Sequence, residues 1–457
     1  MSVVLPALRL SRRSASSLSL LFASLLMHAA CGAGGETVRV ADDAGVDTTE
    51  DGSAALSPDT TEAVADGSSS VQPAEPTAVR FATWNVSMFR PTLGELLADL
   101  QTGTDPQATA AATVIAAQAP DVLLLNEFDY DAEGAALQAF VDLYLDPAFG
   151  GQSPYEFRWV APSNTGVHSG LDLNGDGRLD TTPGSQDYGN DSLGFGVFEG
   201  QYGFAVLSRY PIVTDDIRTF QNLRWADMPD ALLPDNAATP EPADFYSADA
   251  LALFRLSSKN HADVPVRIGD QLVHLLASHP TPPAFDGPED RNGRRNHDEI
   301  VFWTHYADNA GWITDDRGTA GGLQSDALFV VAGDLNNDPF DPADNLRGIQ
   351  RLLDHPRVQS SPVPTSNGGP AAAEEQGQAN ADHQGPDLND TADFSDGAVG
   401  NLRADYVLPS TGMEIVAASV VWPRTGEPFF DLISDEPFAV SDHRMVVVDL
   451  LVPAAAE

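Results

Sequence analysis

Short apolar runs in this chain repeatedly end in polar residues that can carry chemistry. The runs have the length and the bounding turn residues of strands, and they lie at residues 79–84, 122–126, 204–207, 272–277, 328–332, 404–408 and 445–452. Longer stretches have helical patterns, at residues 108–119, 135–143 and 292–308. Strands interleaved with helices predict a layered α/β domain. Ligand and catalytic groups are commonly found at strand ends in such folds.

The polar residues at these strand ends are amides, carboxylates and histidines. They are Asn85, Asn126-Glu127, Ser278-His279, Asp334-Leu335-Asn336, Asp405 and Ser441-Asp442-His443. Each has an ordinary interpretation when taken alone, such as a solvated turn residue, a structural histidine or an Asx turn. Their joint occurrence is harder to explain that way. Amide and carboxylate oxygens suit a hard ion such as Mg²⁺, and His, Asp and Asn supply what in-line attack on phosphorus needs.

The order of these segments resembles the endonuclease/exonuclease/phosphatase superfamily, the group that includes deoxyribonuclease I. The matching segments are Thr83-Trp84-Asn85, Leu125-Asn126-Glu127, GFAVLSRYP from Gly203, Ser278-His279, GDLN from Gly333, Asp405-Tyr406 and SDH from Ser441. They extend over residues 80–453. The resemblance implies an α/β fold, a four-layer α/β/β/α sandwich of two packed mixed sheets flanked by helices, with the site at one edge. The long polar stretches near 162–200, 225–250 and 360–400 are expected to be loop insertions.

The resemblance also implies a divalent metal and a residue at the substrate phosphate. Asn85, Glu127 and Asp442 match positions at or near the metal, which we expect to be Mg²⁺, with Mn²⁺ as the alternative. His279 matches a second histidine that contacts the scissile phosphate in the deoxyribonuclease branch. That branch pairs this histidine with a glutamate, but the nearby region here reads Glu199-Gly200-Gln201, and the sequence assigns no partner to His279.

The remaining matches are catalytic. Asp334 corresponds to the residue that positions or activates the attacking water, and Asn336 to one that stabilises the transition state. His443 corresponds to the catalytic histidine, and Asp405 to the carboxylate that orients it. The resemblance therefore implies hydrolysis of a phosphoester by a metal-dependent enzyme. A phosphomonoesterase and a phosphodiesterase or nuclease are the alternatives that it leaves open.

Arg294 and Arg295, at the start of the helix predicted over 292–308, are candidate substrate-binding residues. Arginine binds phosphate in a bidentate manner, and positive charge is scarce in this chain. The alternative is an ordinary helix-surface ion pair with Asp298 or Glu299.

A loop that includes Asp172, Asn174, Asp176 and Asp180 has the opening spacing of a calcium-binding loop. Its twelfth position is Pro183 rather than a glutamate, so it is not a complete EF-hand. A structural Ca²⁺ and an unliganded Asx-rich turn both fit this pattern.

The charge balance bears on the substrate. The chain has 24 basic and 67 acidic residues, a net charge of −43, and its single lysine is Lys259. Such a surface repels nucleic-acid phosphates, although a bound metal ion reverses the local field. This favours small or locally bound phosphoesters over processive work on DNA. Release of nutrient phosphate, degradation of extracellular nucleic acid and cleavage of lipid head groups all remain open, and we expect a monomer.

The N-terminal region predicts export. Residues 1–31 combine basic residues near the start, a short apolar segment and small residues before Cys31, which resembles a bacterial lipoprotein signal with Cys31 as the lipidated residue. Ordinary signal-peptidase cleavage nearby is the alternative. Residues 32–78 have the composition of a disordered acidic linker, and residues 79–457 form the predicted domain. The predicted location is periplasmic or extracellular, with membrane attachment only through a lipid anchor.

A different class of function also fits the same fold. A surface-anchored binding module could retain the sandwich and lose catalysis. Such a protein would show a broken set of site residues, whereas the complete set is present here. We therefore favour an enzyme.

Overall fold

The structure, a computed structural model, describes residues 75–341, 346–435 and 437–455. These residues belong to one compact unit, residues 71–457. The predicted signal peptide, Cys31 and nearly all of the predicted acidic linker lie outside the described ranges, so those interpretations stay predictions. Within the described ranges, no helix has the length and apolar character needed to cross a membrane.

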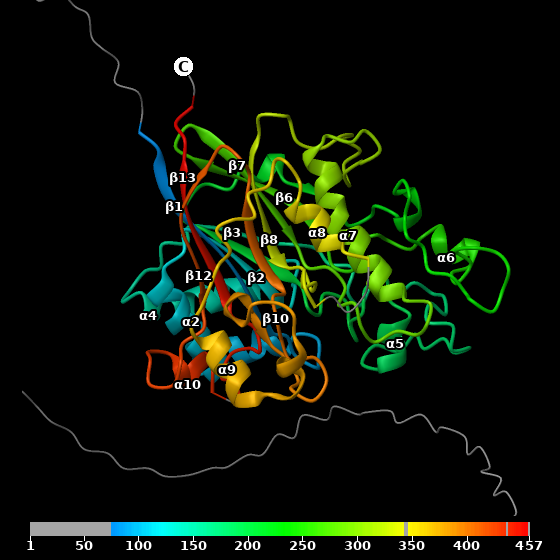
Figure 1. Cartoon of the computed structure of the whole chain (residues 1–457), viewed down its shortest axis with the longest axis horizontal. Helices are drawn as coiled ribbons and strands as arrows, with labels where there is room; N and C mark the ends of the chain where they lie inside the picture. The colour runs from blue at the N-terminus through cyan, green and yellow to red at the C-terminus, as the bar shows by residue number, and fades with distance from the viewer. Residues whose placement is uncertain (1–74, 342–345, 436, 456–457) are drawn as a thin grey trace, which may run out of the picture. The chain divides into compact units, whose positions relative to one another are not determined.

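Two mixed β-sheets form the centre of the unit (Figure 1). The six-stranded sheet has the order β12 (Glu414–Val421), β13 (Met445–Val452), β1 (Thr77–Met88), β2 (Val122–Phe128), β4 (Phe204–Ser208) and β3 (Phe157–Val160). The five-stranded sheet has the order β11 (Asp405–Pro409), β8 (Leu328–Asp334), β7 (Gln271–Ser278), β6 (His261–Ile268) and β5 (Arg218–Thr219). A two-stranded ribbon pairs β10 (Asn401–Leu402) with β9 (Ala392–Asp393).

Helices cover the outer faces of both sheets. Those packed on the six-stranded sheet include α1 (Glu95–Leu100), α2 (Pro106–Gln118), α3 (Ala135–Phe140) and the π-helical turn Val141–Leu145, followed by α4 (Asp146–Ala148). Those packed on the five-stranded sheet are α7 (Arg291–Ala307) and α8 (Gly348–Leu353). The connecting segments carry the short helices α5 (Gln186–Asn190), α6 (Ala248–Leu251), α9 (Gly368–Gln376) and α10 (Phe430–Ile433). Single 3₁₀ turns lie at Thr214–Asp216, Trp225–Asp227, Gln378–Asp382 and Asp387–Asn389.

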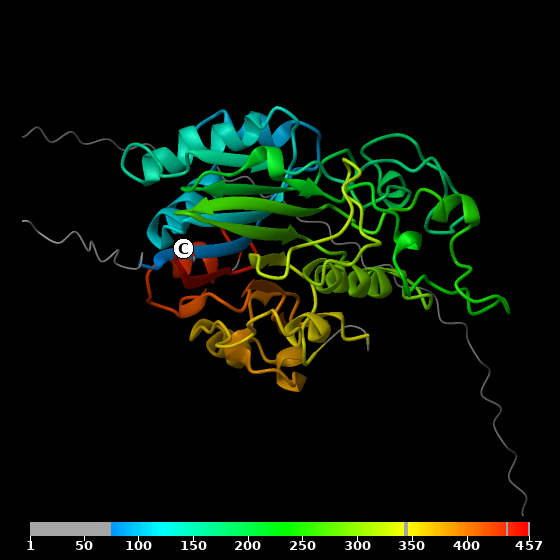
Figure 2. The same cartoon turned by 90° about the horizontal axis from the view of Figure 1, so that it is seen from above.

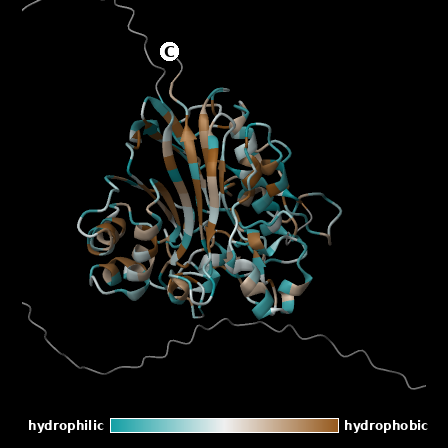
Figure 3. Ribbon diagram, turned by 60° about the vertical axis from the view of Figure 1, so that its left-hand side comes forward, coloured by the Kyte–Doolittle hydropathy of each residue, from teal (hydrophilic) through white to brown (hydrophobic). Residues whose placement is uncertain are grey.

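The side chains of each strand point alternately to the two faces of its sheet, and this explains why four layers form. On β1, Phe81 lies in the core between the sheets while Ala82 faces the helices. On β8, Val330 lies between the sheets while Val331 faces α7 and α8. Because successive side chains of a strand point to opposite faces, each sheet buries both faces. The predicted α/β/β/α sandwich is therefore confirmed: the sheets lie between the two helical layers (Figure 2), and the strands carry the hydrophobic residues (Figure 3).

The strands that the sequence pattern did not predict are β3, β5, β6, β9, β10 and β12. Strand β6 has Pro265 at its centre and polar residues at intervals, and β12 is exposed over much of its length. Short or partly polar strands of this kind have little apolar periodicity. The region 360–400, expected to be a loop insertion, contains α9 and β9, and it packs beside the segment that leads into β13, since Ala392 forms a β-bridge with His443.

Candidate active site

The carboxyl ends of β2 and β8 bring the predicted site residues of both sheets together. Strand β1 runs parallel to β2 with Asn85 opposite Asn126, while β7 runs parallel to β8. The two sheets are joined at this end by a hydrogen bond from the backbone amide of Asp334 to Oδ1 of Asn126, at 3.2 Å. Asn126 is fully buried and was not assigned a role from the sequence.

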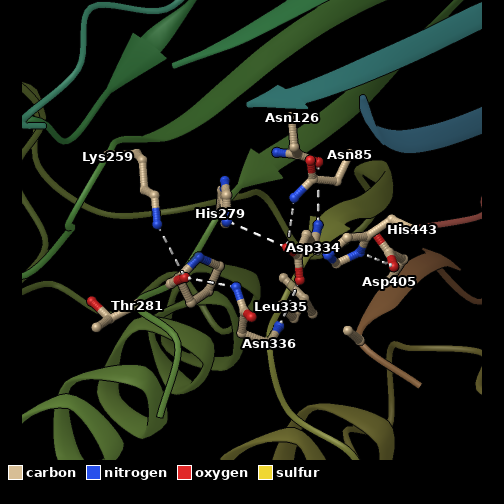
Figure 4. Close-up of polar contacts among 12 residues, drawn as sticks. Asn85, Asn126, Lys259, His279, Thr281, Asp334, Leu335, Asn336, Asp405 and His443 are labelled. Atoms are coloured by element: carbon tan, nitrogen blue, oxygen red, sulfur yellow. Dashed lines mark hydrogen bonds and ion pairs between the residues drawn. The ribbon is translucent and has the colours of Figure 1, made fainter. Parts of the chain in front are cut away.

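One oxygen of Asp334 is the focus of the site (Figure 4). The Nδ2 atom of Asn85 donates to Oδ2 of Asp334 at 3.1 Å. The Nε2 atoms of His279 and His443 lie 3.3 and 3.7 Å from the same oxygen. Burial raises the pKa of the Asp334 carboxyl to about 6, against the opposing effect of His443. Asp334 is thus a carboxylate that can gain or lose a proton near neutral pH.

The Asp405–His443 pair forms the second part of the centre. Asp405 lies directly opposite Asp334 in the β11–β8 register. Its Oδ2 atom is 2.8 Å from Nδ1 of His443, and both residues are buried. Burial alone would lower the pKa of His443, but the facing carboxylates, led by Asp405 and Asp334, hold it well above its ordinary value. This arrangement fixes the ring and directs Nε2 toward Asp334.

The 360–400 region supports this pair. The hydroxyl of Thr391 donates to Oδ2 of Asp405 at 2.9 Å, and the Phe394 ring meets the His443 ring edge-on at 5.3 Å. The backbone amide of Asp393 donates to the carbonyl of Asp442 at 2.8 Å. These contacts join segments that are far apart in the sequence, so the sequence pattern gave no signal for them.

The predicted metal ligands Asn85 and Glu127 are neighbours at the ends of the adjacent strands β1 and β2. Glu127 is half-buried at the end of β2, and burial raises its pKa to about 7, with smaller contributions from Asp442 and Asp334. Asn85 lies beside it and opposes this shift. Glu127 has a backbone φ of 56°, and Ser87 and Asn336 have φ values of 47° and 53°. Such strained conformations in non-glycine residues are concentrated at functional sites.

The GDLN segment requires its glycine. Gly333 has a φ of 148°, and a Cβ atom there would lie 1.9 Å from the carbonyl oxygen of Ser278. Asn336 then turns back, because its amide donates to Oδ1 of Asp334 at 3.0 Å and its Nδ2 donates to the carbonyl of Pro280 at 3.2 Å. These two hydrogen bonds place Asn336 beside the His279 loop.

In the part of the chain that the structure describes, no carboxylate pairs with the Nδ1 atom of His279, the kind of partner that the resemblance to the deoxyribonuclease branch led us to look for. It is buried, and its Nδ1 atom has no hydrogen-bond partner among the described residues. Burial, followed by the charges of Lys259 and His443, holds its pKa well below the ordinary value. We therefore interpret His279 as a neutral ring at this site.

The predicted arginine clamp is not seen. Arg295 is buried, and its guanidinium donates to the backbone carbonyls of Leu193, Arg255 and Leu256 and lies over the Phe254 ring. Arg294 makes one long hydrogen bond, of 3.4 Å, to the carbonyl of Leu233. The structure does not bring either arginine into the hydrogen-bonded group around Asp334. Helix α7 directs Arg294 and Arg295 toward the loop insertions, and the sequence pattern could not indicate this orientation.

The predicted calcium loop is arranged as a series of Asx turns. Both carboxylate oxygens of Asp172 accept backbone amides of residues 175–177, and Asp180 accepts the hydroxyl of Ser185 at 2.6 Å. Over the described ranges, the acidic and histidine ligand atoms that converge within 4.8 Å belong instead to Asp334, Asp405 and His443. Calcium binding by this loop stays a prediction.

A lysine is the chief residue that the sequence reasoning missed. Lys259 is buried at the site and points toward the His279 loop (Figure 4). The one feature of the sequence that could have drawn attention to it is that the chain has no other lysine.

The chain is thus a layered α/β protein, a four-layer sandwich with a group of carboxylates and histidines at one edge of its paired sheets. Carboxylates and histidines grouped in this way are typical of hydrolytic sites. A model of the Endonuclease/Exonuclease/phosphatase family matches residues 82–443, and the chain belongs to this family. Members of the family are hydrolases that act on phosphoesters.

Solved structures with the same fold share little sequence with this chain. An endonuclease/exonuclease/phosphatase from Beutenbergia cavernae is 20% identical, with 83% of this chain and 72% of that chain covered and a TM-score of 0.44. Sphingomyelinase C from Streptomyces griseocarneus is 17% identical, with 82% and 99% covered and a TM-score of 0.40. The beta toxin of Staphylococcus aureus is 13% identical, with 82% and 100% covered and a TM-score of 0.43. No curated protein matches the chain.

Proposed function

We propose that this protein is a divalent-metal-dependent phosphoester hydrolase that uses in-line attack by water and acts outside the cytoplasm. The observation that carries the proposal is the convergence of Asn85, His279 and His443 on one oxygen of Asp334. A buried carboxylate with a pKa of about 6, surrounded by donors, suits the positioning and deprotonation of water.

The donor set fits a divalent cation. Burial raises the pKa of Glu127, and the negative charges of Asp442 and Asp334 are near enough to add to this rise. The oxygens of Asn85 and Glu127 would hold the ion, with Asp442 near it, and oxygen ligands select Mg²⁺ or Mn²⁺. When bound, such an ion neutralises charge on the phosphate group and polarises it for attack.

The protein residues act on the attacking water and on the charge of the phosphoryl group, and the leaving oxygen takes its proton from solvent. Asp334 orients the attacking water and accepts its proton. His443, held protonated by Asp405, faces the same position and stabilises the negative charge that develops on phosphorus oxygens. Asn336 offers its side-chain amide beside the His279 loop for the same purpose.

The substrate and location are supported by sequence properties. The net charge of −43 favours small phosphoesters over processive work on DNA. The N-terminal pattern favours export, with Cys31 as a lipid anchor, and we propose a monomer in the periplasm or at the cell surface. A catalytically inactive binding module is the competing proposal.

The test is a substrate panel with the purified protein. It comprises p-nitrophenyl phosphate, bis-p-nitrophenyl phosphate, plasmid DNA and sphingomyelin, each with and without Mg²⁺. We expect metal-dependent turnover of at least one, and a loss of about 10²–10⁴-fold or more in His443→Ala and in Asp334→Ala. An absence of turnover on every substrate would favour the binding module, and near-native rates in either variant would refute the assigned roles.

A further inference from the structure

Lys259 lies two residues before β6, and its side chain reaches the His279 loop. Lys259 is 7% exposed, and among the described residues its ammonium makes one hydrogen bond, a long one of 3.5 Å from Nζ to the carbonyl of Pro280. In the part of the chain that the structure describes, Lys259 makes no ion pair within 4.0 Å. An ammonium group has three donors, and burying it without acceptors is costly.

The surrounding charges do not relieve this cost. Burial lowers the pKa of Lys259, although the more distant carboxylates of Glu299, Glu127 and Asp334 act in the opposite direction. Both oxygens of Glu299 are already used, since they accept the backbone amides of Ser258 and Thr281 at 2.6 Å. A purely structural lysine would be expected to have a direct carboxylate partner at this depth.

The same contacts hold Lys259 rigidly beside the catalytic loop. Glu299 connects the residue before Lys259 to Thr281, two residues after His279. The carbonyl of Lys259 itself accepts the backbone amide of Asn164 at 2.8 Å. The backbone at Lys259 is therefore held in place by the fold before any substrate binds, and the side chain starts from a fixed position beside the His279 loop.

Two donors converge on one point next to His279. Nζ of Lys259 and Nδ2 of Asn336 both point to the carbonyl oxygen of Pro280, at 3.5 and 3.2 Å. Figure 4 shows both side chains directed to this point from opposite sides. The carbonyl oxygen itself occupies this point, but an ammonium carries three N–H donors and a side-chain amide two, so each group keeps a donor for a phosphoryl oxygen bound beside the carbonyl and next to the imidazole of His279.

We propose that Lys259 is a phosphate-binding residue of this site, which donates to a non-bridging oxygen of the substrate phosphoryl group together with Asn336 and beside His279. Lysine then has the role that the sequence pattern assigned to Arg294 and Arg295. It also accounts for the lack of a carboxylate at Nδ1 of His279 among the described residues, because the positive charge at this side of the phosphate comes from Lys259 rather than from a protonated histidine. This proposal rests on the proposed function.

The single lysine allows a direct test that does not depend on turnover. Protein labelled with ¹³C at the lysine ε-carbon gives one side-chain signal, which reports on Lys259 alone. The signal is followed in the purified protein with Mg²⁺ while inorganic phosphate is added. We expect a saturable shift. We also expect Lys259→Met to weaken phosphate binding, measured by calorimetry, by about 10- to 100-fold, the usual range for a charged hydrogen bond.

The control variant is Arg424→Met, which removes the same charge from an exposed pair with Glu427 and should leave phosphate affinity unchanged. If Lys259→Met does not fold, the isotope experiment on the native protein still decides. Phosphate that inhibits turnover without shifting the lysine signal overturns the Lys259 proposal and leaves the hydrolase assignment intact. A shift in a protein that hydrolyses no phosphoester supports the Lys259 subsite and overturns the hydrolase assignment instead. An absence of any saturable shift overturns the Lys259 proposal in either case.

Discussion

Thr391 and His443 donate to the same oxygen of Asp405, at 2.9 and 2.8 Å. The Thr391 oxygen in turn accepts the backbone amides of Ala404 and Asp405, both at 2.9 Å. Asp405 is therefore held from two sides, and the His443 ring takes its orientation from a carboxylate that cannot rotate freely. A segment that looked like a loop insertion thus helps to set the geometry of the catalytic pair.

Removing the Thr391 hydroxyl should lower kcat without changing KM. In Thr391→Val, Asp405 loses one donor while the substrate contacts remain, and we expect kcat to fall by about 2- to 10-fold, the value of one net hydrogen bond. The measurement is steady-state kinetics on the best substrate of the panel. Thr391→Ser keeps the hydroxyl and should retain most of the native kcat. A Thr391→Ser variant as slow as Thr391→Val would point to packing of the threonine methyl group instead.

Glu127 should control metal affinity in a pH-dependent manner. Its pKa of about 7 in the metal-free protein means that a proton competes with the ion, so Mg²⁺ affinity should fall as pH decreases below 7. Replacing a residue that only supports a metal ligand usually lowers metal affinity by about 10–100-fold. Because Glu127 is itself a predicted ligand, Glu127→Gln should weaken Mg²⁺ binding by at least this factor. Calorimetry of Mg²⁺ binding at pH 6 and 8 provides the measurement. Removal of the metal with a chelator should abolish turnover in the native protein.

The control for this variant is Glu133→Gln, which changes the same kind of side chain at an exposed position shortly after β2. It should bind Mg²⁺ as the native protein does. Equal Mg²⁺ affinity in Glu127→Gln and the native protein would show that the ion is held elsewhere.

The sequence predicted the fold and most of the residues that lie together around Asp334, because both depend on strand ends. Asn85, Glu127, His279 and Asp334 each follow a buried apolar run, and parallel strands bring such ends to one edge of a sheet. Their convergence is a consequence of strand order and register, so it could be expected from the sequence once the family pattern was recognised.

The parts that the sequence did not reveal depend on contacts between distant segments. Thr391 supports Asp405 across the β9–β10 region, and Lys259 approaches the His279 loop because Glu299 of α7 ties the two segments together. The side of α7 that Arg295 occupies is also fixed by tertiary packing. Its neighbours Leu193 and Leu256 belong to other segments, and nothing near Arg295 in the sequence specifies them.

His261 should make the protein sensitive to acid. Its ring is 1% exposed, packs against Phe302 and Trp303, and has Nε2 2.8 Å from the carbonyl of Glu299. Burial lowers its pKa to about 4, whereas a histidine in the unfolded chain titrates near 6.5. Between these values the unfolded chain binds more protons, so the free energy of unfolding is fully retained above pH 6.5 and falls as pH decreases toward 4.

The loss attributable to His261 should reach about 3 kcal/mol by pH 4. Urea unfolding at pH 7, 5.5 and 4.5 measures it. His261→Phe keeps an aromatic ring and removes the titration, so its unfolding free energy should decline less steeply over this range. Parallel pH profiles for the two proteins would rule out this explanation of acid sensitivity.

Asp390 should destabilise the folded protein as pH rises. It is 5% exposed, its Oδ2 atom has no hydrogen-bond partner in the described structure, and the carboxylates facing it include Asp338 and Asp387. Burial and these like charges raise its pKa to about 9. An aspartate in the unfolded chain titrates near 3.9, so between about pH 4 and pH 9 folding must take up a proton at this residue. Stability associated with Asp390 is therefore greatest at low pH and decreases as pH rises.

Replacing Asp390 with Asn should stabilise the protein, because the amide cannot ionise. The gain should be small at pH 4.5 and should reach about 1–4 kcal/mol at pH 7.5, measured by urea unfolding. Asp382→Asn, at an exposed position of the same region, is the matched control and should change stability little at either pH. If Asp390→Asn gains no more at pH 7.5 than at pH 4.5, the carboxyl group is not protonated in the folded protein. Stabilisation of the native protein by a divalent cation that is lost in Asp390→Asn would show that a bound cation neutralises this group instead.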